Sequence, residues 1–472
     1  MYQLIIKNGL SISLLTLTAS FTALASPSFS PVTLDKLNIP PKQCNVRDYG
    51  AEATGIWYDT KAFQTAIDDC AQNGGGKVIV PAGYYLSEPL FLKSNIEFHL
   101  EKDAVLQASA EESAYHPTEE QQKWASSAKS LPLAEQWIGF INIAEEKNIA
   151  ITGEGIIDGQ GSTLLEKYRA ETRKAGKKGP TNRPRLLLFK DANNILIEGV
   201  TIQNSPSFHI VFKNVEDITI NQTTISAPAW WQNTDAIDPM NSRRVTITKN
   251  NISVGDDHVA IKSTISNLSH DFYIADNNFM LGRGLSIGSE TNGGVSNLLA
   301  ENNTFTDAMY GIRIKSPRGK GGEVKDIHYN NNTMINVKTP IVLSAYYKGG
   351  PTTKDARVKA LQEGEFAGGF MLGDQIYPAD NEQPKAYKEN ETPYFNNITF
   401  NNLTVKGKTN YAGFIIGTPE KPFDNIKFSN INIQSELGFK IRNASVEFSK
   451  TTIKVEKGAD IIKENGSKIT NK

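Results

Sequence analysis

Cysteine is scarce in this chain of 472 residues, which contains only Cys44 and Cys70. Free thiols serving catalysis or binding zinc would need His or Cys partners nearby, and the sequence shows none at ligand spacing. In an oxidising compartment the two cysteines are expected to pair with each other. We therefore predict a Cys44–Cys70 disulfide that joins the first strand to the first helix, and no metal site.

An excess of charge of one sign is lacking too. The chain has 50 Lys and Arg residues and 51 Asp and Glu residues, for a formal net charge of −1. No global field therefore draws the protein to nucleic acid or membrane, and an anionic ligand would need a local patch.

A long apolar run occurs only at the start of the chain. Residues 10–25 follow Lys7 and end in Ala23-Leu24-Ala25, which matches a signal-peptidase site. The run is short and rich in Ser and Thr, unlike a transmembrane helix. Residues 1–25 are thus predicted to be a signal peptide, with an uncleaved anchor as the alternative, and the protein to be secreted or periplasmic.

The rest of the chain changes character twice. Residues 26–43 contain four prolines and predict an extended lead-in. Apolar residues at a helical period between Tyr58 and Gln72, after the possible cap Asp59, predict a helix. After three glycines, short strands repeat roughly every 20 to 30 residues. We expect strands at residues 77–80, 96–100, 149–152, 195–197, 218–220, 245–247, 272–274, 298–300, 327–329, 398–400 and 426–428.

Asparagines recur just after or between these segments, where their side chains suit tight turns and left-handed backbone. They stand at positions 221, 250, 251, 277, 278, 302, 303, 330–332, 401, 402 and 430. When one turn recurs at each coil, such residues can stack in a ladder. The pattern predicts an all-β chain, residues 44–472, that forms one right-handed parallel β-helix with a short N-terminal capping helix. A β-propeller is the alternative, disfavoured because tight hairpins and blade signatures are missing.

Three segments interrupt the repeat and predict loops: residues 111–136, which are polar, residues 162–185, which are basic, and residues 348–391, which are long with an apolar middle. Loops of this length tend to be functional or disordered. Each is expected to wall a cleft, or, for the basic segment, to be a solvated surface.

Four motifs stand in order between residues 233 and 315. They are Asn233-Thr234-Asp235, Gly255-Asp256-Asp257, Gly282-Arg283-Gly284 and Arg313-Ile314-Lys315. Residues at the same phase of successive coils lie side by side, so these motifs predict a carboxylate cluster flanked by cations. At a bend, Asp256 and Asp257 would both enter one cleft, and their repulsion would keep a proton available. Glycoside hydrolysis needs such carboxyl groups, and the cations suit an acidic sugar polymer.

Together with residues 204–209, 233–239 and 286–290, these motifs resemble those of glycoside hydrolase family 28 polygalacturonases, especially bacterial secreted pectinases. The resemblance implies a right-handed parallel β-helix that hydrolyses α-1,4 galacturonosyl bonds in polygalacturonate or pectin with inversion, without metal or cofactor. By position, Asp256 would be the general acid, while Asp235 and Asp257 would hold the attacking water. Inversion implies carboxyl groups roughly 6.5–9.5 Å apart. A monomer is the default for an enzyme acting on a bulky polymer.

The same resemblance implies substrate-binding residues. Arg313 and Lys315, on one face of a strand, would bind galacturonate carboxylates. Tyr347 would lie against a sugar ring, with ordinary packing as the alternative. Asn233 would line the cleft, and His209 would line or merely support it.

One departure concerns Arg283, because the family usually has Gly-His-Gly where this chain has Gly282-Arg283-Gly284. Arg stays protonated near neutral pH, so a cation beside Asp256 would favour the carboxylate and oppose its role as acid. Three outcomes are open: Arg283 binds a further substrate carboxylate, it weakens activity or shifts it to lower pH, or the protein has become a pectin-binding β-helix. His258 compensates only if the strand does not turn it away. A polysaccharide lyase on the same fold, often with Ca²⁺, is the other alternative.

Overall fold

The computed structural model describes residues 37–125, 136–174, 183–266, 269–347, 370–372, 375–377 and 380–472. Pro31–Lys472 form one compact unit. The expected signal peptide and most of the lead-in lie outside the described residues. Within the described ranges, no helix has both the length and the apolar character needed to cross a membrane.

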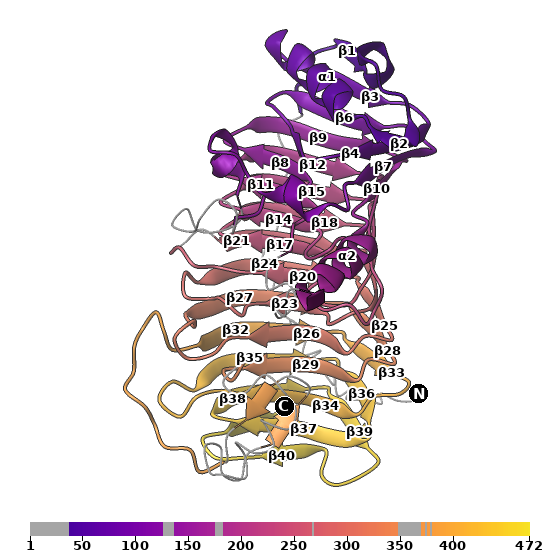
Figure 1. The fold of residues 1–472 in the computed structure, drawn as a ribbon. Helices are drawn as coiled ribbons and strands as arrows, with labels where there is room; N and C mark the ends of the chain where they lie inside the picture. The colour runs from indigo at the N-terminus through magenta and orange to yellow at the C-terminus, as the bar shows by residue number, and fades with distance from the viewer. Residues whose placement is uncertain are drawn as a thin grey trace, which may run out of the picture. The chain divides into compact units, whose positions relative to one another are not determined.

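The described residues build three long parallel sheets, and most coils add one strand to each sheet (Figure 1). The first sheet contains β1 (Gln43–Asn45), β3 (Gly76–Val80), β6 (Ile96–Leu100), β9 (Lys147–Gly153), β12 (Asn193–Glu198), β15 (Glu216–Asn221), β18 (Arg243–Thr248), β21 (Ser269–Ala275), β24 (Val295–Glu301), β27 (Glu323–Asn330), β32 (Tyr394–Asn401), β35 (Phe423–Ser429), β38 (Ala444–Ser449) and β41 (Lys468–Asn471). The second contains β2 (Thr54–Tyr58), β4 (Gly83–Ser87), β7 (Ala104–Ala108), β10 (Ile156–Asp158), β13 (Thr201–Gln203), β16 (Thr224–Ser226), β19 (Asn251–Val254), β22 (Asn278–Leu281), β25 (Thr304–Thr306), β28 (Thr333–Ile335), β33 (Thr404–Lys406), β36 (Asn432–Ser435) and β39 (Thr452–Val455).

The third sheet carries the residues that matter most for function. It contains β5 (Leu90–Phe91), β8 (Ile141–Ala144), β11 (Leu187–Lys190), β14 (Ile210–Lys213), β17 (Ile237–Met240), β20 (Val259–Ile261), β23 (Leu285–Ile287), β26 (Tyr310–Lys315), β29 (Thr339–Ser344), β34 (Tyr411–Ile416), β37 (Leu437–Arg442) and β40 (Ile461–Lys463). Parallel pairing of each strand with the strand one coil away makes the fold a parallel β-helix, right-handed as predicted, and rules out the propeller.

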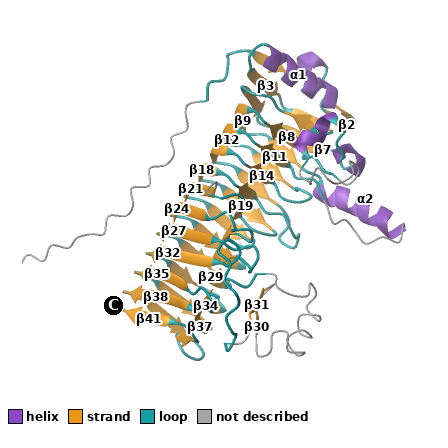
Figure 2. Cartoon of the chain, turned by 90° about the vertical axis from the view of Figure 1, so that its left-hand side faces the viewer, coloured by secondary structure: helices purple, strands orange, loops and turns teal. Residues whose placement is uncertain are grey.

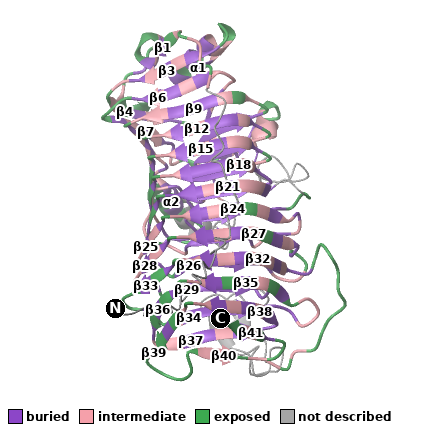
Figure 3. Cartoon of the chain, turned by 180° about the vertical axis from the view of Figure 1, so that it is seen from behind, coloured by how far each residue is buried: buried purple, intermediate pink, exposed green. Residues whose placement is uncertain are grey.

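Alternate residues of every strand face the interior, where equivalent positions of successive coils stack. In the first sheet, Ile197 pairs with Ile220, Ile220 with Ile247, and Ile247 with Ile274, all fully buried. The middles of the first-sheet strands are buried along the stack (Figure 3). Burial of each such side chain stabilises the fold by about 1.5–3 kcal/mol, which fixes the register between coils.

The asparagines divide into two groups. Asn302, Asn331, Asn402 and Asn430 adopt positive φ between 54° and 56°, as expected for left-handed turn residues. A second group, Asn250, Asn277, Asn303 and Asn332, points inward and forms the expected ladder. In the ladder, each amide Nδ2 donates to the next Oδ1, as from Asn277 to Asn303 at 2.9 Å.

The first coil is closed by α1 (Thr60–Gln72), which packs against β1, β3 and β5 at the end of the stack (Figure 2). The predicted Cys44–Cys70 disulfide joins β1 to α1, with an S–S distance of 2.02 Å. Asp59 takes the N-cap position without capping the helix. Its carboxylate accepts hydrogen bonds from the backbone N–H groups of Glu52 and Ala53 instead.

The interrupting segments are more ordered than expected. The basic segment contains α2 (Gly161–Lys174), so the loop prediction was wrong there. Buried Leu164 and Leu165 anchor this helix. The polar segment contains the 3₁₀ helices η2 (Glu112–Tyr115) and η3 (Glu120–Trp124), like η1 (Val46–Tyr49) before it.

The long segment contains an antiparallel hairpin, β30 (Phe370–Leu372) and β31 (Gln375–Tyr377), while most of residues 348–379 lies outside the described residues. Its last part is tied down by ion pairs, Glu382 to Arg318 at 2.8 Å and Asp380 to Arg442 at 3.2 Å.

The ladder gives a test of the fold. Asn277→Ala would leave buried partners at Asn250, Asn303 and the Ile247 carbonyl unsatisfied. We expect it to lower the free energy of unfolding by about 1–3 kcal/mol. Asn278→Ala, at an exposed neighbour, should change it by less than about 0.5 kcal/mol. Chemical denaturation measures both, and equal effects would contradict the ladder's stabilising role.

Candidate active site

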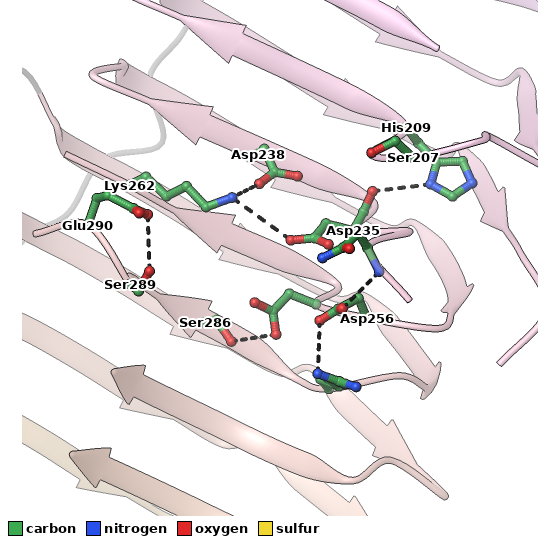
Figure 4. Close-up of polar contacts among 12 residues, drawn as sticks. Ser207, His209, Asp235, Asp238, Asp256, Lys262, Ser286, Ser289 and Glu290 are labelled. Atoms are coloured by element: carbon green, nitrogen blue, oxygen red, sulfur yellow. Dashed lines mark hydrogen bonds and ion pairs between the residues drawn. The ribbon is translucent and has the colours of Figure 1, made fainter. Parts of the chain in front are cut away.

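Three aspartates converge where the chain passes from the second sheet to the third. Asp235 lies in the turn between β16 and β17, and Asp256 and Asp257 lie in the bend between β19 and β20, one coil later. One carboxylate oxygen from each lies within 4.8 Å of the others. The sequence prediction that all three enter one site is confirmed, and Figure 4 shows Asp235 and Asp256 side by side.

Asp257 is the buried, ionised member of the cluster. Arg313 Nη2 donates to Asp257 Oδ1 at 2.5 Å, Lys315 Nζ donates to Oδ2 at 2.6 Å, and Ser286 Oγ donates to Oδ1 at 3.0 Å. Burial alone would raise the pKa of Asp257, but Arg313 and Lys315 hold it well below its usual range. Asp257 is therefore a carboxylate under all ordinary conditions.

Asp235 has the opposite environment. Burial raises the pKa of Asp235 well above its usual range, with further contributions from the charges of Asp238 and Asp256. Lys262 Nζ, at 3.9 Å from Asp235 Oδ2, opposes this rise only in part, because it pairs closely with Asp238 (Figure 4). The Oδ1 atom of Asp235 accepts no hydrogen bond from any described residue. Asp235 is thus the carboxyl group of the cluster best placed to retain a proton.

Asp256 borders the open side of the cluster. Its Oδ2 accepts a hydrogen bond from the Asn233 backbone N–H at 3.0 Å. Arg283 Nη1 lies 3.7 Å from its Oδ1, so the expected placement of Arg283 beside Asp256 is confirmed. The Arg283 side chain is 23 % exposed.

The Gly282-Arg283-Gly284 turn is wrapped around His258. The His258 Nδ1 atom accepts a hydrogen bond from the Gly284 N–H at 3.1 Å, and its Nε2 lies 3.2 Å from the Met280 carbonyl. A Cβ at Gly282 would lie 2.7 Å from Nε2. Burial lowers the pKa of His258 to about 4, so the ring is neutral. The strand turns His258 away from the carboxylates. His258 therefore supports the Arg283 turn and does not take the place of the histidine that the family usually has at position 283.

Three of the predicted substrate ligands are instead enclosed. Arg313 is fully buried against Asp257, and Lys315 is nearly so, with its Nζ 4.7 Å from the centre of the Tyr347 ring. Tyr347 itself is buried, which favours the packing alternative. Direct binding of a substrate carboxylate by Arg313 is therefore ruled out in this conformation, because its guanidinium lies behind Asp257. Asn233, by contrast, is exposed beside the cluster.

His209 is also enclosed, which favours the alternative that it supports the cleft without touching substrate. Its side chain is fully buried, with Nδ1 3.1 Å from the Asp235 carbonyl and Nε2 3.2 Å from the Ser226 carbonyl. Burial lowers its pKa to about 4. His209 therefore fixes the backbone on both sides of the Asp235 turn (Figure 4).

Sequence reasoning missed the pair formed by Asp238 and Lys262, and the supporting residue Ser286. All three occupy outward positions on β17, β20 and β23 or directly after them. The sequence did carry a signal for these residues. Asp238 and Ser286 stand in the quoted motifs, and Lys262 has the same position relative to its own strand as Lys315 has relative to β26. Alternation along each strand would have placed them on the cleft face.

The spacing of the carboxylates is given by their nearest oxygens, one from each group, which lie within 4.8 Å of one another. The same oxygens form a group that could hold a metal ion. Arg283, Lys262, Arg313 and Lys315 already supply four positive charges around it, so the cluster does not require a cation for neutralisation.

Comparison with known proteins agrees with this geometry. The family model of glycosyl hydrolases family 28 matches residues 70–363. The chain belongs to this family. It is therefore a glycoside hydrolase, and the three aspartates belong to a family 28 enzyme. An endo-polygalacturonase of Pectobacterium carotovorum subsp. carotovorum is 35 % identical over 314 residues, which cover 61 % of this chain and 72 % of the relative.

Two further relatives extend the likeness over more of this family 28 chain. A polygalacturonase of Ralstonia nicotianae is 30 % identical over 404 residues, covering 73 % of each chain. The solved polygalacturonase from Erwinia carotovora ssp. carotovora is 26 % identical, has a TM-score of 0.65, and covers 88 % of this chain and 100 % of that one.

The two buried aspartates should affect stability with opposite signs. The lowered pKa of Asp257 contributes stability above its unfolded pKa, so Asp257→Asn should destabilise the fold at pH 7 by about 3–5 kcal/mol, since Arg313 and Lys315 lose their partner. The raised pKa of Asp235 contributes stability that is lost as pH rises through the folded value. Asp235→Asn should therefore gain stability relative to wild type as pH rises above the unfolded pKa of Asp, about 4. Thermal unfolding measures both, and effects of equal sign would contradict the assignment.

Proposed function

We propose that the protein is a secreted, monomeric hydrolase that cleaves α-1,4 galacturonosyl bonds in polygalacturonate or pectin with inversion of configuration. The convergence of Asp235, Asp256 and Asp257 under four cationic side chains carries this proposal. Carboxyl groups supply the acid and base of glycoside hydrolysis, while the cations suit a polymer with a carboxylate on each sugar. The names of the relatives above point to the same substrate class.

In this proposal Asp256 is the general acid that protonates the leaving glycosidic oxygen. Its side chain is 10 % exposed, against 7 % for Asp235 and 2 % for Asp257, so it reaches the cleft best. Burial, together with the charges of Asp238 and Asp256, raises the pKa of Asp235, so the cluster keeps a proton available beside Asp256.

Asp257 and Asp235 hold the attacking water. Asp257 is permanently ionised by Arg313 and Lys315, and the free Oδ1 of Asp235 lies in the same cluster. Two hydrogen bonds of about 2.8 Å span up to about 5.6 Å, so one water can reach oxygens of both groups, which lie within 4.8 Å of each other. The short spacing is therefore compatible with attack by a water that the carboxylates hold directly.

In this proposal Arg283 binds a substrate carboxylate. This is the first of the three possibilities left open by the arginine that replaces the usual histidine. Its partly exposed guanidinium stands beside the acid, where a galacturonosyl residue at the cleavage point would place its carboxylate. Such a contact is charge-assisted and can be bidentate. With Arg313 and Lys315 enclosed, Arg283 has the most exposed side chain of the three predicted cations.

The decisive test is incubation of the mature protein with polygalacturonic acid. We expect new reducing ends without ultraviolet absorbance from an unsaturated sugar, and no loss of activity with a chelator. Asp256→Asn should lower turnover by about 10²–10⁴-fold with the fold intact. Unsaturated products would show a lyase. An absence of products from any pectin would point to the pectin-binding alternative. Turnover by the Asp256→Asn variant within about tenfold of wild type would contradict the assignment of Asp256 as the acid.

A further inference from the structure

One aromatic side chain beside the carboxylates has no part in the mechanism above. Trp230 is 74 % exposed, the highest value among the exposed large apolar residues of the described chain. Its indole stacks on that of Trp231, with ring centres 5.4 Å apart and planes at 5°. Trp231 is buried in the core. The stack holds the Trp230 ring in one orientation, with its other side open to solvent.

The turn that carries this pair is built into the carboxylate cluster. The Trp231 carbonyl accepts a hydrogen bond from Thr234 Oγ1 at 2.9 Å, and that hydroxyl accepts one from the Gly255 N–H at 3.0 Å. A Cβ at Gly255 would lie 2.1 Å from the Trp231 carbonyl oxygen. The turn therefore packs directly on the residue that precedes Asp256, and any side chain at position 255 would displace it.

A second set of contacts fixes the same turn from outside. Arg183 Nη1 donates to the Gln232 carbonyl at 3.0 Å, and Arg183 Nη2 donates to Asn233 Oδ1 at 2.8 Å. The Asn233 N–H in turn binds Asp256 Oδ2. These contacts fix residues 231–233 relative to Asp256, and Trp230 is held to them by its stack on Trp231.

We propose that Trp230 is a sugar-stacking platform for the galacturonosyl unit next to the cleavage point. The C–H groups on one side of a pyranose ring make an apolar face that fits a flat indole, and Trp buries a large area with little loss of conformational freedom. This inference rests on the proposed function, because it takes the bound polymer to be polygalacturonate.

The order of the coils places this platform opposite Arg283. The Trp230 turn comes one coil before the Asp256 bend, and the Arg283 turn comes one coil after it. Neighbouring coils are about 4.8 Å apart. One sugar would therefore rest on an uncharged ring, and the sugar across the scissile bond would meet a guanidinium. Stacking on Trp230 does not depend on the charge of the sugar. A methyl-esterified unit is therefore tolerated on the Trp230 side of the scissile bond and not on the Arg283 side.

The experiment uses the full mature chain with Asp256→Asn, so that oligogalacturonates are bound without being cleaved. Calorimetric titration with a galacturonate hexamer should show that Trp230→Ala raises Kd about tenfold. Trp230→Tyr should keep Kd within about threefold of the parent, because a flat ring remains. Trp57→Ala is the matched control, since Trp57 is 67 % exposed on β2, several coils from the site.

In the active enzyme, Trp230→Ala should raise KM for polygalacturonate and leave its melting temperature unchanged, because the side chain is exposed. Equal Kd values for the Trp230→Ala and Trp57→Ala variants, with cleavage by wild type intact, would overturn the platform and leave the proposed function standing. Failure of wild type to cleave polygalacturonate, together with failure of the Asp256→Asn parent to bind the hexamer, would overturn both.

Discussion

The buried pairing of Asp257 with Arg313 and Lys315 is the interaction on which the site depends. It links the bend before β20 to β23 and β26, because Ser286 on β23 bonds both Asp257 and Arg313. A slip of one residue between these coils would turn Arg313 inward and leave a buried charge without a partner. The stacked isoleucines fix the register, and the fixed register brings the charges together. Fold and site are therefore set by the same alignment of coils.

The pairing also helps to place three carboxyl groups of one type in different electrostatic environments. Two cations keep Asp257 ionised, whereas burial, Asp238 and Asp256 favour the protonated form of Asp235. Environments that push neighbouring pKa values apart are how one cluster can hold both an acid and a base. Lys262 sits between Asp235 and Asp238, so it moderates the repulsion without cancelling it. Asp256, with Arg283 at its side, has the most exposed side chain of the three carboxyl groups.

Much of this could be predicted from the sequence, because it follows from local periodicity and from motifs. Strand spacing indicated the coils, the two cysteines indicated their bond, and the motif order indicated the aspartate cluster. How deeply each side chain is buried could not be predicted in this way. Alternation put Arg313 on the cleft face, but only the packing of neighbouring coils shows that it lies behind Asp257. The burial of His209, which decides between lining and supporting the cleft, depends on the same packing.

Two other features depended on contacts that the sequence pattern does not carry. The helix α2 was hidden by the basic composition of its segment, although Leu164 and Leu165 supply its buried side. The distance between carboxylates depends on the bend at Gly255, where the backbone touches the Trp231 carbonyl. A spacing rule taken from other glycosidases could not anticipate that approach.

The central claim is that a water held between Asp235 and Asp257 attacks the sugar directly. Proton NMR of a rapid oligogalacturonate digest tests it, because the first product is seen before mutarotation. Direct attack on the α-bond predicts that the β-anomer appears first and the α-anomer follows slowly. An α-anomer as the first product would contradict the account and would indicate a covalent intermediate on one of the clustered carboxylates.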